Sequence, residues 1–197
     1  MQDIEHTEQL NGYTIRIMRD IYCHQSPADE GDDSVFLVGY HNDFFVESKE
    51  VTKDEVRNLF MSPSELEKDE LARRKEIEKQ FHVFGLEAYI HSGVVLALRG
   101  EGGFPDRQWD VSQLGAVFVS RKEARTEKQA RTIALAHIKY WNNYLSGNVY
   151  GFHIVKMETC KCCGHTNEEI VDSAWGFNGD MEESGVLEEA RASVPKK

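Results

Sequence analysis

The residues with the clearest capacity for chemistry are the cysteines and the histidine of one short segment. Positions 160–165 read Cys-Lys-Cys-Cys-Gly-His. Cys160 and Cys163 have the spacing of a turn in which two thiolates converge on one ion, and the glycine after them permits a tight backbone curl. His165 is the candidate for a third ligand. The pattern predicts a structural zinc site at this turn.

A tetrahedral zinc site needs a fourth ligand, and Cys23, His24 or His153 are the candidates elsewhere in the chain. The sequence has no second C-x-x-C pair, so a hairpin tip that merely contains reduced cysteines remains an alternative. An ion held here is expected to be a structural clip and not a catalyst, because no H-E-x-x-H or H-x-E pattern accompanies the turn.

A second group of candidates consists of polar and aromatic side chains at the ends of predicted strands. Its members are His91, Ser92, Trp109, Asp110, Gln113, Asp172 and Trp175. If these strand ends meet at one concave edge, the side chains would line a ligand pocket in which an Asp–His pair does acid–base chemistry. The alternative for each residue is a local role, because Asp and Ser near turns usually bond the nearby backbone and tryptophans usually fill cores.

The glycine-rich segment 99–105, Arg-Gly-Glu-Gly-Gly-Phe-Pro, resembles a phosphate cradle in composition only. The Lys-Ser/Thr pair that completes a P-loop is missing, and no helix is expected directly after the segment. We therefore predict a lid or connector. The sequence also shows no Ser-His-acid order, dinucleotide fingerprint, kinase motif set or paired-carboxylate motif.

Composition limits the partners of the protein. The 197 residues include 34 acidic and 23 basic side chains, a formal charge of −11 that disfavours direct binding to nucleic acid or to an anionic membrane. No run of about 18 apolar residues is present, so no membrane-spanning helix is expected. The first residues lack the pattern of a secretory signal, and the crowded cysteines do not suit a disulfide framework. These features predict a cytoplasmic protein.

The elements that must position the candidate residues follow from periodicity and capping. Residues 12–19 and 35–40 are predicted to be a pair of strands joined by an exposed loop. Capping boxes at Thr52 with Glu55 and at Ser62 with Glu65 predict helices over 52–84. The second of these helices carries oppositely charged residues at helical spacing, which predicts ion pairs between Asp69 and Arg73 and between Glu70 and Arg74.

The second half of the chain is predicted to contain further strands and one long helix. Two short strands flank His91, and a buried strand covers 114–119. Ser120 and Glu123 form a capping box that predicts a helix start, with the helix running to about Leu145 and ending before a glycine. Strands at 149–157 and 169–177 are predicted to form a hairpin around the cysteine turn.

Together these elements predict an α+β fold with a mainly antiparallel sheet, one long core-packed helix and a charged helical arm at 52–84. Residues 1–180 are assigned to a single domain and 181–197 to an acidic tail. At this length, a division into two domains would leave each part with a thin core.

Several motifs resemble those of an uncharacterised family of bacteriophage and mobile-element proteins. They are His91-Ser-Gly, Trp109-Asp-Val-Ser-Gln-Leu-Gly115, Tyr144-Leu-Ser-Gly-Asn-Val-Tyr-Gly-Phe152 and Asp172-Ser-Ala-Trp-Gly-Phe177. The resemblance covers about 86–180 and implies a mobile-element origin. The last motif of the family often has cysteine where this chain has Ala174, so no role for that thiol carries over.

A functional expectation follows from the resemblance, the acidic charge, the charged arm at 62–80 and the lack of a complete catalytic signature. We expect an accessory protein that binds a host macromolecule, such as a defence protein or one that processes nucleic acid, and inhibits it. The alternative is binding, sequestration or hydrolysis of a small nucleotide-like ligand at a pocket formed by His91 and Asp110.

Overall fold

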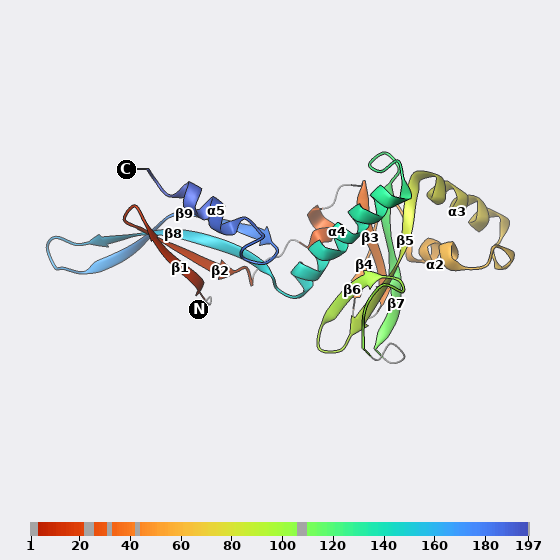
Figure 1. Ribbon diagram of the computed structural model, residues 1–197, viewed down its shortest axis with the longest axis horizontal. Helices are drawn as coiled ribbons and strands as arrows, with labels where there is room; N and C mark the ends of the chain where they lie inside the picture. The colour runs from red at the N-terminus through yellow and green to blue at the C-terminus, as the bar shows by residue number, and fades with distance from the viewer. Residues whose placement is uncertain (1–3, 22–25, 31–32, 42–43, 106–109, 197) are drawn as a thin grey trace. The chain divides into compact units, whose positions relative to one another are not determined.

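The computed structural model describes residues 4–21, 26–30, 33–41, 44–105 and 110–196. It confirms the predicted α+β class, and every strand pairing in its two sheets is antiparallel. Within this fold the described residues gather into two compact units (Figure 1). We call 26–145 the central unit, and 4–21 with 146–196 the terminal unit.

The central unit is built on a five-stranded sheet with the order β4-β3-β7-β5-β6. Its strands are β3 (Val35–His41), β4 (Phe44–Val46), β5 (Phe81–Ile90), β6 (Val94–Leu98) and β7 (Val111–Ser120). The middle strand, β7, is buried from Leu114 to Ser120, as its continuous apolar run predicts. Strands β5 and β6 meet at the predicted turn around His91.

Helices cover both faces of this sheet (Figure 1). On one face lies α4 (Glu127–Leu145), the predicted long core helix, which packs Ile138 and Trp141 into a cluster with Val117. On the other face lie α2 (Lys53–Phe60) and α3 (Lys68–Gln80), whose few apolar side chains pack against Phe118. The charged helical arm is therefore anchored to the sheet. A short helix, α1 (Pro27–Glu30), precedes β3.

The predicted start of the long helix at Ser120 was wrong. Strand β7 continues to Ser120, and the next residue is still held because the Arg121 N–H donates to the Gln80 carbonyl at 2.9 Å. The helix begins at Glu127, where the Thr126 hydroxyl accepts from the Gln129 N–H at 3.3 Å and the Gln129 side chain accepts in return. A second capping box along the chain thus sets the start.

The helical arm has the predicted cap at Thr52, but it ends at Gln80 and not at Phe84, because β5 begins at Phe81 and pairs with β7. Its ion pairs also differ from those predicted. Arg73 bonds Glu55 of α2 at 2.6 Å, and Arg74 bonds Glu78 at 2.9 Å. The arginines also reach backbone carbonyls outside α3, which draws them away from Asp69 and Glu70. The box at Ser62 caps a short 3₁₀ helix at Pro63–Glu65, and α3 follows it.

The terminal unit is built on a four-stranded sheet with the order β1-β2-β8-β9. Its strands are β1 (Ile4–Leu10), β2 (Tyr13–Arg19), β8 (Val149–Thr159) and β9 (Thr166–Asn178). The predicted pairing of the first two apolar segments was wrong, because β2 pairs with β1 and β8 and not with β3. Strand β1 was not predicted, although Asn11-Gly12 is a typical two-residue hairpin turn.

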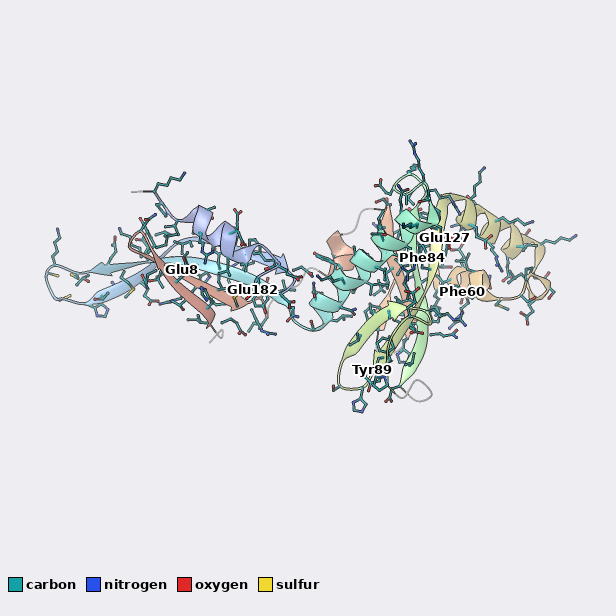
Figure 2. All side chains as sticks on the ribbon, viewed as in Figure 1. Glu8, Phe60, Phe84, Tyr89, Glu127 and Glu182 are labelled. Carbon is teal, nitrogen blue, oxygen red and sulfur yellow. The ribbon has the colours of Figure 1, made fainter. Side chains whose placement is uncertain are left out.

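The C-terminal segment belongs to the core of the terminal unit. Helix α5 (Val186–Ser193), in the stretch assigned by sequence to an acidic tail, packs Val186 and Ala190 against Ile15 and Phe152. The Arg191 guanidinium at its end forms a salt bridge of 2.7 Å with Glu8 of β1, which Figure 2 labels. None of the helices in the described ranges is long and apolar enough to cross a membrane.

Candidate metal centre

The cysteine turn lies at the end of the long hairpin formed by β8 and β9, as predicted. These strands pair from Val149 to Thr159, whereas β2 accompanies β8 only as far as Val155. Beyond that point the hairpin is a two-stranded ribbon that extends past the other described strands of its unit (Figure 1). We call this part, 157–169, the ribbon. All its described side chains are exposed except Cys160, which is half-buried.

Backbone hydrogen bonds close the turn at the tip of the ribbon. The Cys160 N–H donates to the His165 carbonyl at 2.7 Å, and the Gly164 N–H donates to the Cys160 carbonyl at 2.9 Å. Gly164 has a φ of 72°, in the left-handed region that favours glycine. The glycine therefore serves the backbone curl that the sequence predicts.

The turn brings three thiols together. The Sγ atoms of Cys160, Cys162 and Cys163 all lie within 4.8 Å of one another, close enough to hold a metal ion. The sulfurs of a tetrahedral zinc site, with Zn–S bonds of about 2.3 Å, lie about 3.8 Å apart. The Sγ atoms of Cys160 and Cys162 are 2.8 Å apart and would have to separate by a small side-chain movement.

The environment of Cys160 favours its thiolate form. Hydrogen bonding by the Cys162 thiol, followed by the backbone N–H groups of Cys162 and Cys163, lowers the pKa of Cys160 to about 6. The same contact with Cys160 raises the pKa of Cys162. Because metal ligands must be deprotonated, Cys160 is the member of the group that is most ready to bind an ion.

The predicted ligands are only partly brought together. Cys160 and Cys163 converge, and Cys162, which the prediction did not include, joins them. The ring of His165 is not part of this group among the described residues, although its carbonyl helps to close the turn. His153 lies in the middle of β8, roughly 20 Å from the tip at about 3.3 Å per residue, with its ring 5.3 Å from that of Trp175.

The remaining candidates for a fourth ligand, Cys23 and His24, lie outside the described residues. The described part of β2, the strand before them in the sequence, ends beside Tyr150, at the opposite end of β8 from the cysteine turn. The signal for Cys162 was present in the sequence, because three cysteines in four positions project from one tight turn. The C-x-x-C spacing alone selects Cys160 and Cys163 and leaves out Cys162.

The second group of candidates is divided between the two units. His91 and Ser92 are exposed at the turn between β5 and β6, and the carbonyl of Asp110 accepts from the Ile90 N–H at 3.0 Å. The rings of His91 and Tyr89 are stacked with their centroids 6.2 Å apart. Figure 2 labels Tyr89, which lies towards one end of the central sheet. Gln113 is exposed on β7. Trp109 lies outside the described residues.

Asp172 and Trp175 belong to the terminal unit. The Asp172 carboxylate accepts from the adjacent Ser173 N–H at 2.8 Å, which is the local role weighed against a pocket role. Trp175 lies against β8 at a glycine: a Cβ added to Gly151 would stand 2.1 Å from the indole. Beside it, burial and the positive charge of Arg16 lower the pKa of His153.

The glycine-rich segment is held by an acidic residue that the sequence analysis missed. The N–H groups of Gly100 and Gly102 donate to the two carboxylate oxygens of Glu87, at 2.8 and 3.1 Å. Glu87 is only 3% exposed. These amides face an internal carboxylate, which fits the predicted connector better than a phosphate cradle. The signal was one glutamate inside the apolar strand segment Leu86–Ile90.

The chain matches no protein-family model, no curated protein and no solved structure.

Proposed function

We propose that this chain is a binding protein that acts through the ribbon, whose tip is clipped by a zinc ion at Cys160, Cys162 and Cys163. One observation carries the proposal: three thiol sulfurs lie within 4.8 Å of one another at the exposed end of the ribbon. Thiolates favour soft and borderline ions, and zinc is the usual ion of structural thiolate sites.

An ion at this place would order the tip and leave the core unchanged. A two-stranded hairpin alone is marginally stable in water, and the paired strands of the ribbon have no third strand among the described residues. A zinc ion that joins three side chains of one turn removes much of the remaining freedom of the tip. The ordered tip then offers a partner a defined surface, at a lower entropic cost on binding.

In this proposal the partner is a host protein, in keeping with the mobile-element origin that the resemblance implies. The ribbon, 157–169, carries three glutamates and one lysine, within a chain of net charge −11. Such a surface complements a basic partner. Proteins that process nucleic acids present basic grooves, and an acidic ribbon that enters such a groove would block it.

The zinc site is tested by metal analysis of the full chain purified under reducing conditions. We expect one zinc ion per chain. The control is the triple variant Cys160→Ser, Cys162→Ser and Cys163→Ser, which should contain none while keeping the circular dichroism of the wild type, because the tip lies outside the hydrophobic core. A wild-type chain that stays zinc-free after exposure to excess zinc would overturn the proposal.

The binding role is tested by capture from host lysate with the wild type and the triple-serine variant. We expect a basic protein that the wild type retains and the variant loses, with the interaction then reproduced by the purified pair. A matched control reverses the charges of two exposed lysines on α3, Lys68 and Lys75, and leaves the ribbon unchanged. Equal capture by wild type and triple-serine variant would remove the ribbon from the proposal.

The alternative, a nucleotide-like ligand near His91 and Asp110, has one observation in its favour. The Tyr89 ring is stacked with those of His91, at 6.2 Å between centroids, and of Phe104, at 5.6 Å, and nucleic-acid bases stack on aromatic side chains. The amides of the neighbouring loop are taken by Glu87, so the phosphates would need other donors. A thermal shift with nucleotides or cyclic dinucleotides that His91→Ala abolishes would favour this alternative over the ribbon.

A further inference from the structure

The three cysteines at the tip, Cys160, Cys162 and Cys163, supply three ligands, whereas zinc in proteins takes four. Within the described ranges, no further histidine, cysteine or carboxylate has its ligand atom within 4.8 Å of all three sulfurs. The residues around the thiols, 161–169, are exposed. A metal ion held by the three sulfurs would therefore keep one side facing solvent.

The carboxylates nearest along the ribbon are already paired with cations. The Glu158 carboxylate accepts from the Lys156 ammonium at 2.7 Å, and Glu168 forms a bidentate salt bridge with Arg16. A carboxylate that left such a pair to ligate the ion would give up its partner. These side chains are poor candidates for the fourth ligand.

His165 is the strongest internal rival for the fourth position. It follows Gly164 directly, and its ring is exposed. Its backbone is fixed by the bond between its carbonyl and the Cys160 N–H, at 2.7 Å. The ring is outside the group formed by the three sulfurs, so its participation has to be tested directly.

We infer that the fourth coordination position of the zinc ion is open to solvent. The imidazole of a histidine from a partner protein would fill this position in place of water. This inference rests on the proposed zinc site. Three thiolates and one zinc ion together carry a charge of about −1. A neutral imidazole completes the tetrahedron without adding charge to an already acidic ribbon, whereas a carboxylate or a fourth thiolate would add one. Zinc sites with an open position bind exchangeable ligands, and closed sites do not.

The test uses cobalt(II), which occupies zinc sites and reports its ligands by absorption. The full-length wild type, His165→Ala and the triple-serine variant are loaded with cobalt and titrated with imidazole, and with acetate as an anionic control. We expect thiolate-to-cobalt charge-transfer bands in the first two proteins. Imidazole should shift the d–d bands of both saturably, and acetate should leave the bands in place.

The outcomes separate this inference from the proposal beneath it. Absence of charge-transfer bands in the wild type would remove the metal site itself. Charge-transfer bands with d–d bands that do not respond to imidazole would show a closed site and overturn only the open position. A response confined to His165→Ala would assign the fourth ligand to His165 and likewise overturn the inference.

Discussion

Two turns of this protein place backbone N–H groups around an acidic side chain, and they differ in access to water. In the central unit, the amides of Gly100 and Gly102 bind the carboxylate of Glu87, which is 3% exposed. In the terminal unit, the amides of Cys162 and Cys163 stabilise the Cys160 thiolate at a solvent-exposed tip.

The difference shows that backbone N–H groups directed at an acidic side chain can serve either the fold or ligand binding. A buried carboxyl group that accepts from these two amides leaves them no capacity to bind a ligand, so the turn contributes to the fold. The thiolate of Cys160, which is half-buried at a tip whose other side chains are exposed, keeps its remaining lone pairs for a ligand, so the turn can bind one. Each of the following experiments changes one of the two turns and measures whether the effect appears in stability or in binding.

The largest expected effect is on metal binding at the cysteine turn. Cys160→Ser should weaken zinc binding on the order of 100-fold or more, because it removes a ligand and the favoured thiolate together. Zinc affinity is measured by competition with a chromophoric chelator. Cys162→Ser should weaken zinc binding at least about tenfold if the site is the three-cysteine group. Unchanged affinity in Cys162→Ser would point back to the set predicted from sequence, Cys160 with Cys163 and His165.

The next effect is on stability and concerns the buried carboxylate. Glu87→Ala should lower the free energy of unfolding by about 2 kcal/mol, because two loop amides lose their acceptor in a buried place. Denaturant unfolding measures this change, and Glu87→Gln, which keeps one acceptor oxygen, should lose less. Zinc affinity should stay within about twofold of the wild type in both variants, since the changed residue serves the other turn. A Glu87→Ala variant that is as stable as the wild type would contradict this contrast between the turns.

The sequence was informative where local rules decide the structure. The hairpin around the cysteines, the buried strand β7 and the cap at Thr52 are all present. Each depends on apolar periodicity or on a side chain bonding the backbone three residues away.

The predictions that failed depend on contacts between distant segments. The partner of β2 is β8, more than a hundred residues later, and no local pattern encodes that choice. The start of α4 was misplaced because two capping-box sequences follow each other, at Ser120 and at Thr126. Ser120 belongs to strand β7, so the helix begins after Thr126. Glu87 was missed because its role depends on a loop that only the folded sheet brings to it.

A smaller effect comes from two glycines with the same backbone requirement. Gly100 has a φ of 84° and Gly164 of 72°, and a Cβ added to either meets no atom within 4 Å. Alanine at each position therefore costs about 1 kcal/mol of backbone strain. Gly100→Ala should lower global stability by that amount. Gly164→Ala should leave global stability unchanged and weaken zinc binding about fivefold, since its turn orders only the site.

The smallest expected effect is on thiol reactivity, and it reports the anion itself. The pKa of Cys160 is lowered to about 6, so in the metal-free protein its thiolate is present above that pH and is lost as the pH falls through it. Alkylation of Cys160 by iodoacetamide, followed by mass spectrometry, should have its pH midpoint near 6. Cys162 is the internal control, because the pKa of its thiol is raised and its midpoint should lie above that of an ordinary cysteine. At neutral pH the rate advantage of Cys160 over an ordinary thiol is only about fourfold, because a less basic thiolate is also a weaker nucleophile. Coincident midpoints for the two cysteines would show that the amides of the turn do not single out one anion, and the parallel with the carboxylate of Glu87 would then fail at its chemical basis.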